Sequence, residues 1–584
     1  MAMQRIINDP NLVVEDMLKG FLKCHKDRLH ADPANPRSIV SNSFNEKPKV
    51  GIVTGGGSGH KPAFIGYCGR NMVDAVAVGE IFSSPTAEAF EQCIRAVDQG
   101  LGVAVLYGNY AGDNMNVKMA KRAAEKDGIG VGLVVANDDV PSAAPTERDK
   151  RRGVAGEIMM WKCGGARAAL GGSLDEVIAC AQKAVDNTRS VGIGLGPCTI
   201  PANGKPNFHI EPGTMEVGIG HHGEPGVRVE PLKSADEMAQ EMVDIVLPDL
   251  PFGAGDEVVV LVSGLGATPI MEQYILFSKV YDLLEEKGIK VYKSYVGDYF
   301  TSLEMNGITL TVMKLDDELK TCIDMPVECD GLTQLGFEPA VEAAAVSPVA
   351  VAAVAGAAES APLPVKAKDE RERVGATIKN AGNAGIALAI CAAIHENAAY
   401  LSEIDGETGD GDHGINMNKG FLMSKDRITE DMSLAEALNT IGETLVKDIG
   451  GSMGPIYGTF FETLADGLDV PEFDATDLAD TLDNVVAALK DLAGAEEGDK
   501  TLIDTAAPAA RAFRVAAEEG KDLAGCIAAM EMGAADGLES TRSMQAKIGR
   551  AARLGERSIG HLDAGAASCC IILTTFSNGL AAQL

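Results

Sequence analysis

The segment Lys49–Phe64, KVGIVTGGGSGHKPAF, passes from a run of apolar and β-branched residues directly into a glycine-rich loop that ends at His60. This composition indicates a buried strand with a turn at its carboxyl end. The loop is superficially similar to the dinucleotide-binding pattern G-x-G-x-x-G, but counting from Gly55 puts His60 where the third glycine belongs. The segment therefore favours an α/β fold in which a strand end delivers a histidine to a ligand site.

Further β-rich runs, separated by helix-length segments, extend this pattern through the first half of the chain. They are AVAVG (75–79), GVAVLYGN (102–109), GVGLVVAND (130–138), EVVVLVSGLG (257–266) and GITLTVMKLD (307–316). Alternating strands and helices predict an α/β domain over residues 1–335. The stretch SVGIGLGPCTI, from Ser190, begins a second α/β lobe, so we expect this domain to contain two subdomains.

The second half has a different composition. Residues 336–367 are almost all Ala, Val, Pro, Gly and Ser and are predicted to form a linker, with a buried alanine-rich helix as the alternative. Residues 368–584 contain long windows rich in alanine and leucine, such as 382–404 and 478–495. Scarcely any β-branched run interrupts them, so this region is predicted to be an all-α domain.

Length and charge limit the possible partners and location. A chain of 584 residues exceeds the size of one hydrophobic core, so at least two domains are expected. A net charge of −33 argues against binding to nucleic acid or an anionic membrane, and an anionic substrate would need a metal ion or backbone donors. The twelve cysteines show no C-x-x-C spacing and suggest a reducing compartment. We expect neither an apolar signal region nor a membrane span, so the predicted location is cytoplasmic.

Three aspartates in the helical half, Asp405, Asp410 and Asp412, lie in the glycine-rich segment DGETGDGDHGINMNKG (405–420). A turn of this kind can bring carboxylates to one point, where their oxygens suit Mg²⁺. The segment lacks the ligand alternation and the twelfth-position glutamate of a calcium EF-hand. A solvated acidic loop is the alternative interpretation.

Three other segments of the helical half together favour a nucleotide site: GGSMGPIYGTFF (450–461), EEGDKTLID (496–504) and KIGRAARLGERSIGHLDAGAAS (547–568). Glycine-rich helix entries offer N–H groups to phosphate oxygens, and Arg550 and Arg557 can add charge-assisted hydrogen bonds. No G-x-x-x-x-G-K-[ST] sequence occurs in the chain, so the predicted site is not a P-loop.

The α/β half offers two further motifs. The segment GNYAGDNMN (108–116) places Asp113 after a predicted strand and turn, where it and His60 could both meet a substrate hydroxyl. The segment VGIGHHGEPGVR (217–228) holds His221 and His222 side by side. Adjacent residues on a strand point to opposite faces, so at most one of these two histidines is expected to face a given pocket.

In both halves these motifs resemble those of the dihydroxyacetone kinase family. The resemblance implies that the helical half is an α-helical barrel that binds ATP, with two Mg²⁺ ions held by Asp405, Asp410 and Asp412. It implies a nucleotide site lined by His413, Gly414, Ile415, Asn416, Ser452, Met453, Arg550, Asp563, Ala564 and Gly565. The family often reads GGASGP where this chain has GGSMGP, so Met453 replaces a serine and Ser452 is a possible substitute.

For the α/β half, the resemblance implies that His222, immediately before GEPG, attacks the ketone carbon of a short-chain ketose and holds it as a hemiaminal. His221 would then be a buried or supporting histidine. His60 and Asp113 would orient and deprotonate the hydroxyl that attacks the γ-phosphate. The substrate-binding residues would be Gly57, Ser58, Gly59, His60 and Asp113. A homodimer is implied, with the active site formed in cis or in trans.

Three departures from the family pattern concern the substrate. Gly108 stands where the family commonly has a substrate-contacting lysine, and Lys61 and Phe64 replace the glutamate and histidine of GHEPAH. Loss of a long side chain at 108 should leave room, and the variant pattern is more similar to the erythrulose kinases of the family. Dihydroxyacetone and a four-carbon ketose are therefore both candidate substrates. The resemblance also implies ATP as the donor, because family members fed by a phosphotransferase relay carry similar domains on separate chains, whereas here both domains share one chain.

Two other functions stay open at this stage. The first is a lyase that forms cyclic FMN from FAD at the same nucleotide site, which the resemblance allows. The second is a non-catalytic sensor, against which the complete set of predicted catalytic and Mg²⁺-binding residues argues.

Overall fold

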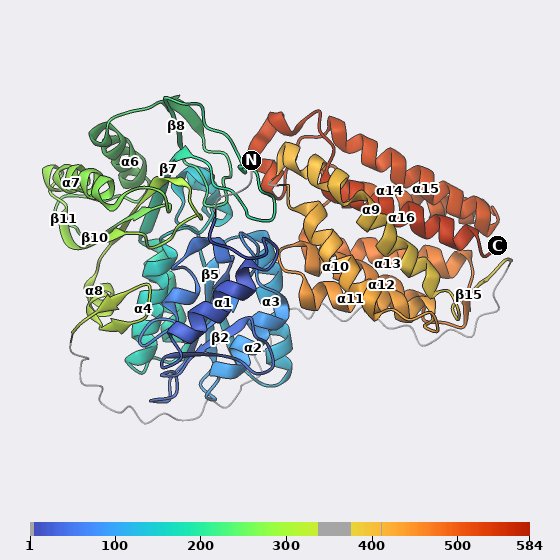
Figure 1. Cartoon of the computed structure of the whole chain (residues 1–584), viewed down its shortest axis with the longest axis horizontal. Helices are drawn as coiled ribbons and strands as arrows, with labels where there is room; N and C mark the ends of the chain where they lie inside the picture. The colour runs from blue at the N-terminus through green and yellow to red at the C-terminus, as the bar shows by residue number, and fades with distance from the viewer. Residues whose placement is uncertain (1–4, 337–374, 410) are drawn as a thin grey trace. The chain divides into compact units, whose positions relative to one another are not determined.

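The computed structural model describes residues 5–336, 375–409 and 411–584 (Figure 1). It divides the chain into two compact units, Met1–Val351 and Ala352–Leu584. The predicted linker lies, except for its first residue, outside the described residues.

In the part that the structure describes, the first unit contains two six-stranded sheets with helices on their faces, which confirms the predicted α/β class with two subdomains. In the first sheet the strand order is β1-β2-β4-β3-β5-β6, and β4, β3, β5 and β6 run parallel. Its strands are β1 (Leu29–Ala31), β2 (Ser38–Ser41), β3 (Gly51–Gly56), β4 (Ala75–Val78), β5 (Val103–Gly108) and β6 (Val131–Ala136). The helices near it are α1 (Val13–Cys24), α2 (Ala87–Val97), α3 (Ala111–Lys126), α4 (Glu157–Ala169) and α5 (Leu174–Asp186).

The alternation of side chains along β3 shows how this sheet is buried. Ile52 packs into the core that α4 and α5 help to form, whereas Val53 packs into the core formed with α2 and α3. Both faces are covered, so the strand is hydrophobic on both sides. The parallel strands β3 and β5 end at the same edge, where the loops carrying His60 and Asp113 begin.

The second sheet has the order β11-β10-β12-β7-β8-β9 and is antiparallel except for the pair β10–β11. Its strands are β7 (Thr188–Gly196), β8 (Thr214–Val217), β9 (Arg228–Pro231), β10 (Glu257–Gly264), β11 (Lys290–Gly297) and β12 (Asn306–Lys314). Helices α6 (Ala235–Asp249) and α7 (Ile270–Glu286) form a separate core with it. Leu261 and Met313, from β10 and β12, instead join the core of the first sheet with α8 (Asp317–Asp324). The short strands β13 (Val327–Glu328) and β14 (Thr333–Gln334) follow α8 in the chain and pair with each other.

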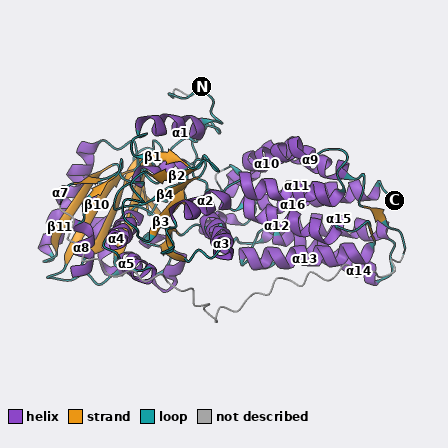
Figure 2. Cartoon of the chain, turned by 90° about the horizontal axis from the view of Figure 1, so that it is seen from below, coloured by secondary structure: helices purple, strands orange, loops and turns teal. Residues whose placement is uncertain are grey.

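Within its described residues, the second unit forms a closed ring of eight helices, drawn side by side in Figure 2. They are α9 (Ala384–Thr408), α10 (His413–Arg427), α11 (Leu434–Asp448), α12 (Met453–Leu468), α13 (Ala475–Ala493), α14 (Ile503–Glu518), α15 (Leu523–Ser540) and α16 (Ala564–Ala581). Each helix packs against the next in chain order, and α16 packs against α9. This closure confirms the predicted helical barrel, to which one short strand pair, β15 (Ile378–Lys379) with β16 (Glu472–Phe473), is added.

Two helices of this ring, α9 and α16, are long and apolar enough to span a membrane by length and composition alone. The expectation that no segment reaches this threshold is therefore wrong. The two helices pack against each other, and both contribute buried side chains, such as Ile390 and Leu573, to the core of the ring. Burial within the ring gives a physical reason for their apolar composition.

Candidate active site

His60 and His222 face each other in the first unit, with their Nε2 atoms 3.0 Å apart. His60 ends the turn that follows β3, and its Nδ1 lies 2.7 Å from the carbonyl oxygen of Thr301. A carbonyl only accepts, so Nδ1 of His60 carries the proton and donates it. Burial, and then the nearby His222 and His221, hold the pKa of His60 well below its usual value, so His60 is neutral near pH 7. Nε2 of His60 therefore accepts a hydrogen bond from Nε2 of His222.

Glu224 holds the other side of the His222 ring. Its Oε1 lies 3.1 Å from Nδ1 of His222, and its Oε2 accepts the backbone N–H of His222 at 2.9 Å. The buried guanidinium of Arg152 lies 3.7 Å from Glu224 and 2.7 Å from Asp139. The carboxylate thus orients the ring so that Nε2 faces His60. The sequence analysis missed Glu224, although it stands within the GEPG motif, and Arg152, for which no motif gave a signal.

His221 lies in the same turn as His222, so the strand alternation assumed for this pair does not apply. Both rings lie near His60, with centroid distances of 6.1 Å for His221 and 5.0 Å for His222. However, Nε2 of His221 pairs with Oγ1 of Thr309 at 3.1 Å, and burial lowers its pKa to about 3. His221 is therefore a buried histidine, and His222 is the one that directs a ring nitrogen at His60.

Asp113 lies in the first turn of α3 and is buried. Burial raises its pKa to about 7, and its Oδ1 has no hydrogen-bond partner among the described residues. Tyr110, which precedes the same helix, places its ring 5.0 Å from that of His222. A carboxyl that titrates near neutrality is suited to general-base work.

The loop Gly57–Ser58–Gly59 is held by close packing. A Cβ added at Gly59 would lie 2.3 Å from the ring of Phe82, and one at Gly57 would lie 2.9 Å from the Phe82 backbone. Oγ of Ser58 donates to the carbonyl of Gly79 at 2.6 Å. The glycines are therefore needed for the path that brings His60 to its position.

Aromatic rings surround His60. The centroids of Phe82, Phe300 and Phe64 lie 5.0, 5.2 and 6.2 Å from that of His60. The half-buried Lys61 places Nζ 3.4 Å from the Ser58 carbonyl oxygen, and burial lowers its pKa to about 7. The departures at 61 and 64 thus place a weakly basic amine and an apolar wall beside the histidine.

The space beside Gly108 is not open. A Cβ added there would lie 2.3 Å from Oε1 of Glu157, a fully buried residue at the start of α4. The expectation that loss of a side chain at 108 leaves room is therefore wrong, because a carboxyl from another element occupies the space.

In the second unit, carboxylates gather where α9 ends and α10 begins. Oδ2 of Asp405 accepts the N–H of His413 at 3.3 Å, and Oδ2 of Asp412 accepts the amide of Asn416 at 3.0 Å. Burial and the charge of Asp405 raise the pKa of Asp412 to about 7. Burial, with Asp405 as a smaller cause, raises the pKa of Asp563 to about 7. Mutual repulsion of this kind would be relieved by a divalent cation.

Among the described residues, no group of three or more His, Cys, Asp or Glu side chains is placed to hold a metal ion. Asp410 lies outside those residues, so the predicted trio of aspartates is represented by Asp405 and Asp412 alone.

Three helix N-termini of the ring are joined by one hydrogen-bond network. Nε2 of His413, the first residue of α10, lies 2.8 Å from Oγ of Ser568 in α16. The hydroxyl of Tyr457, in α12, lies 2.6 Å from the same Oγ and donates to the carbonyl of Gly565 at 3.1 Å. Because α10, α12 and α16 all begin here, their unpaired N–H groups are available to phosphate oxygens.

The other predicted nucleotide residues belong to these helix starts. Gly414, Ile415 and Asn416 lie in the first turn of α10, Ser452 and Met453 at the start of α12, and Asp563, Ala564 and Gly565 at the start of α16. Arg550 begins the segment Arg550–Ser558, but its side chain lies outside the described part of the structure.

Lys500 lies in the segment 496–504 that the sequence analysis assigned to the nucleotide site, but it was given no role of its own there. Its buried Nζ donates to the carbonyls of Met544 at 3.2 Å and His561 at 2.8 Å, and also to that of Ser558. The lysine therefore ties together both ends of the loop that contains Arg550.

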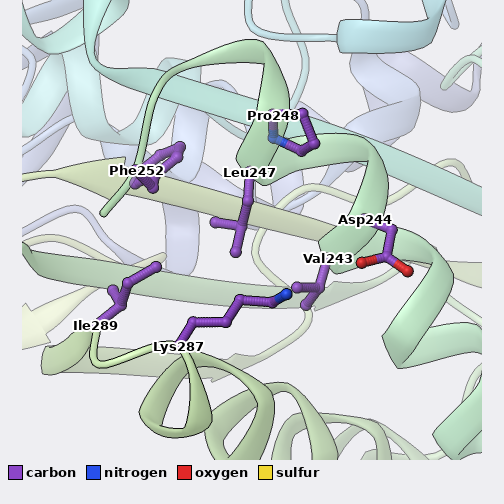
Figure 3. A pocket seen from close by; sticks show the side chains of 7 residues that line it. All are labelled: Val243, Asp244, Leu247, Pro248, Phe252, Lys287 and Ile289. Carbon is purple, nitrogen blue, oxygen red and sulfur yellow. The ribbon is translucent and has the colours of Figure 1, made fainter. Parts of the chain in front are cut away.

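One cavity of about 280 Å³ lies elsewhere, between α6 and the turn before β11 (Figure 3). It is lined by Val243, Asp244, Leu247, Pro248, Phe252, Lys287 and Ile289. None of the predicted site residues lines it.

Comparison with known proteins assigns both halves. A Dak1 domain matches residues 19–331, and a DAK2 domain matches residues 407–578. The chain is 33% identical to the L-erythrulose kinase of Pectobacterium atrosepticum over 98% of this chain and 96% of that protein. It is 34% identical to the D-erythrulose kinase of Mycolicibacterium smegmatis over 99% of this chain and 98% of that protein. The dihydroxyacetone kinase of C. freundii, solved in complex with AMP-PNP and Mg²⁺, has a TM-score of 0.53 and 26% identity, covering 99% of this chain and 100% of that one.

A Dak1 α/β domain joined to a helical DAK2 domain defines a phosphotransferase of the kinase type. The chain belongs to the dihydroxyacetone kinase family. The complex of the C. freundii enzyme with AMP-PNP and Mg²⁺ supports ATP and Mg²⁺ as ligands within this family.

Proposed function

We propose that the chain uses ATP to phosphorylate a terminal hydroxyl of a short-chain ketose that is held covalently by His222. The observation that carries this proposal is the 3.0 Å contact between the Nε2 atoms of His60 and His222, with Glu224 on the opposite nitrogen of His222. Dihydroxyacetone and erythrulose are the candidate substrates, and the names of the two relatives favour erythrulose. Residues 1–335 would bind the ketose and residues 368–584 would bind ATP.

The capture step is a nucleophilic addition. Nε2 of His60 first takes the proton from Nε2 of His222, which frees the lone pair on that nitrogen. The lone pair forms the bond to the ketone carbon while the C=O π bond breaks, and His60 returns the proton to the former carbonyl oxygen. The substituted ring keeps its Nδ1–H, and its positive charge stays paired with Glu224. Glycerol has no carbonyl carbon, so it cannot be captured in this way.

The transfer step needs a base and a stabilised phosphate. Asp113, as the carboxylate, accepts the proton of the terminal hydroxyl while that oxygen bonds to the γ-phosphorus and the bond to ADP breaks. The N–H groups at the starts of α10, α12 and α16 would bind phosphate oxygens. Mg²⁺, held by Asp405, Asp410 and Asp412, would supply charge neutralisation on the phosphates when bound.

A matched pair of variants, His222→Ala and His221→Gln, tests the proposal. With dihydroxyacetone and erythrulose labelled with ¹³C at the carbonyl, we expect the wild type and His221→Gln to convert the trigonal carbon signal into a tetrahedral, protein-bound one and to release ADP. His222→Ala should do neither, and glycerol should give no ADP with any form. Full phosphorylation by His222→Ala would contradict covalent capture, and ADP formation from glycerol would contradict ketose selection.

The proposal also keeps the expected homodimer and the cytoplasmic location. Light scattering on the purified chain and fractionation of cells would test them.

A further inference from the structure

Glu157 has no structural task that explains its burial. Its side chain is fully buried at the start of α4, and neither carboxyl oxygen has a hydrogen-bond partner among the described residues. A buried polar group without a partner costs free energy. The helix start does not need it, because Asp138 accepts the N–H groups of Val154 at 3.1 Å and of Gly156 at 2.9 Å. An unexplained buried acid is a candidate for function.

The neighbours of this carboxyl lie beside the loop that carries Asp113, whose charge also acts on it. Its Oε1 would lie 2.3 Å from a Cβ added at Gly108 and 3.1 Å from one added at Gly153. Gly108 ends β5 two residues before Tyr110, whose ring contacts His222. The hydroxyl of Tyr110 donates to the carbonyl of Gly153 at 3.1 Å. The carboxyl therefore lies against Gly108, where the loop leading to Asp113 begins, and against Gly153, whose carbonyl accepts from Tyr110.

The protonation state of Glu157 matters for what it can bind. Burial, followed by the charges of Asp138 and Asp113, raises its pKa well above the usual value. Burial therefore favours the protonated acid, which has one O–H donor and one carbonyl acceptor. The Phe64, Phe82 and Phe300 rings around His60 offer neither.

We propose that Glu157 determines substrate specificity by hydrogen bonding the hydroxyl on the fourth carbon of a tetrulose. Dihydroxyacetone ends at its third carbon and cannot make this contact. The inference rests on the proposed function, because it concerns the ketose bound at the same site. A site built to hydrogen bond a hydroxyl discriminates against a substrate that lacks it, since the buried polar group then stays unpaired.

Glu157→Met and Glu157→Gln, assayed with erythrulose and dihydroxyacetone, test the inference. The methionine variant removes both hydrogen-bonding atoms, so kcat/KM for erythrulose should fall roughly tenfold while that for dihydroxyacetone stays within about twofold. The glutamine variant should keep most of the wild-type preference, because an amide also offers a donor and an acceptor. An equal loss with both ketoses, or no loss with either, would overturn the inference.

Two further measurements separate specificity from folding and from the proposed function. Glu157→Met should unfold at or above the wild-type temperature, because it removes an unpaired buried acid. A lower unfolding temperature, together with an equal fall in kcat/KM for both ketoses, would show that Glu157 serves the fold rather than specificity. Asp138→Asn is the matched control, a buried acid with hydrogen-bond partners, and should lower stability without changing the substrate ratio. Calorimetry without ATP measures how strongly the protein binds each ketose, and so gives the preference for erythrulose over dihydroxyacetone independently of phosphorylation. If the ketoses bind but are not phosphorylated, the proposed function is refuted, and the binding preference still decides the role of Glu157.

Discussion

Replacing Glu224 with glutamine should slow ketose capture while leaving ATP binding intact. The carboxylate accepts from Nδ1 of His222 at 3.1 Å and from its backbone N–H at 2.9 Å, and it pairs with Arg152 at 3.7 Å. Glutamine keeps the shape and one acceptor oxygen but loses the negative charge that pairs with a positively charged His222 ring. A hydrogen bond to a charged group contributes about 1.5–3 kcal/mol. Since about 1.4 kcal/mol corresponds to a factor of ten, kcat/KM for the ketose should fall roughly 10- to 100-fold.

Steady-state kinetics with the ketose and ATP varied separately would check this expectation. The KM for ATP should not change, because Glu224 belongs to the α/β unit. Glu216→Gln is a suitable control, since Oε1 of Glu216 accepts the N–H of Gly226 at 2.6 Å in the same loop. A Glu224→Gln enzyme with ketose kcat/KM within about twofold of the wild type would refute the orienting role.

Three other outcomes are expected. Because Asp113 acts as the carboxylate and its pKa is raised to about 7, kcat/KM should rise roughly tenfold per pH unit below pH 7 and level off above it, and a pH–rate profile without this limb would exclude Asp113 as the base. The folded state also keeps the Asp113 proton at pH values where the unfolded chain has lost it, so the free energy of unfolding falls as pH rises from about 4 to 7. Asp113→Asn should therefore raise the unfolding temperature at pH 8 but not at pH 3.5. Lys500→Met leaves the carbonyls of Met544, Ser558 and His561 without their hydrogen-bond donor. We therefore expect a several-fold rise in the KM for ATP and faster proteolysis of the 544–561 loop, with an unchanged KM for the ketose. Lys521→Met, at an exposed lysine, is the control.

The strands and the two-unit organisation could be predicted because their signals are local. Runs such as GIVTG and GVAVLYG have the composition of strands covered on both faces, and β3 and β5 form there. The long alanine-rich windows likewise became α9 and α13. Closure of the ring was not visible in composition, because it depends on α16 packing against α9, nearly two hundred residues earlier in the chain.

The supporting residues of the site could not be predicted because their partners are distant in sequence. Arg152 meets the carbonyl of Gly218, and Lys500 meets that of Ser558, at separations of 66 and 58 residues. Glu157 reaches the end of β5 from a helix that starts about fifty residues later. A lone charged residue in a helical or loop segment looks like a solvated side chain, and only the fold shows that it is buried.

The sequence-based expectation for Gly108, which lies beside Glu157, was also wrong. A glycine in place of a long side chain suggests a larger pocket, but protein interiors are close-packed, so space released at one position is usually filled from another element. Here the space beside Gly108 holds a carboxyl rather than an apolar group, although an apolar side chain would not incur the cost of an unpaired buried acid. Packing therefore explains why position 108 is filled but not why the group that fills it is an acid. Recognition of a substrate hydroxyl supplies a reason for that chemistry, because it pairs the carboxyl only when the correct ketose is bound.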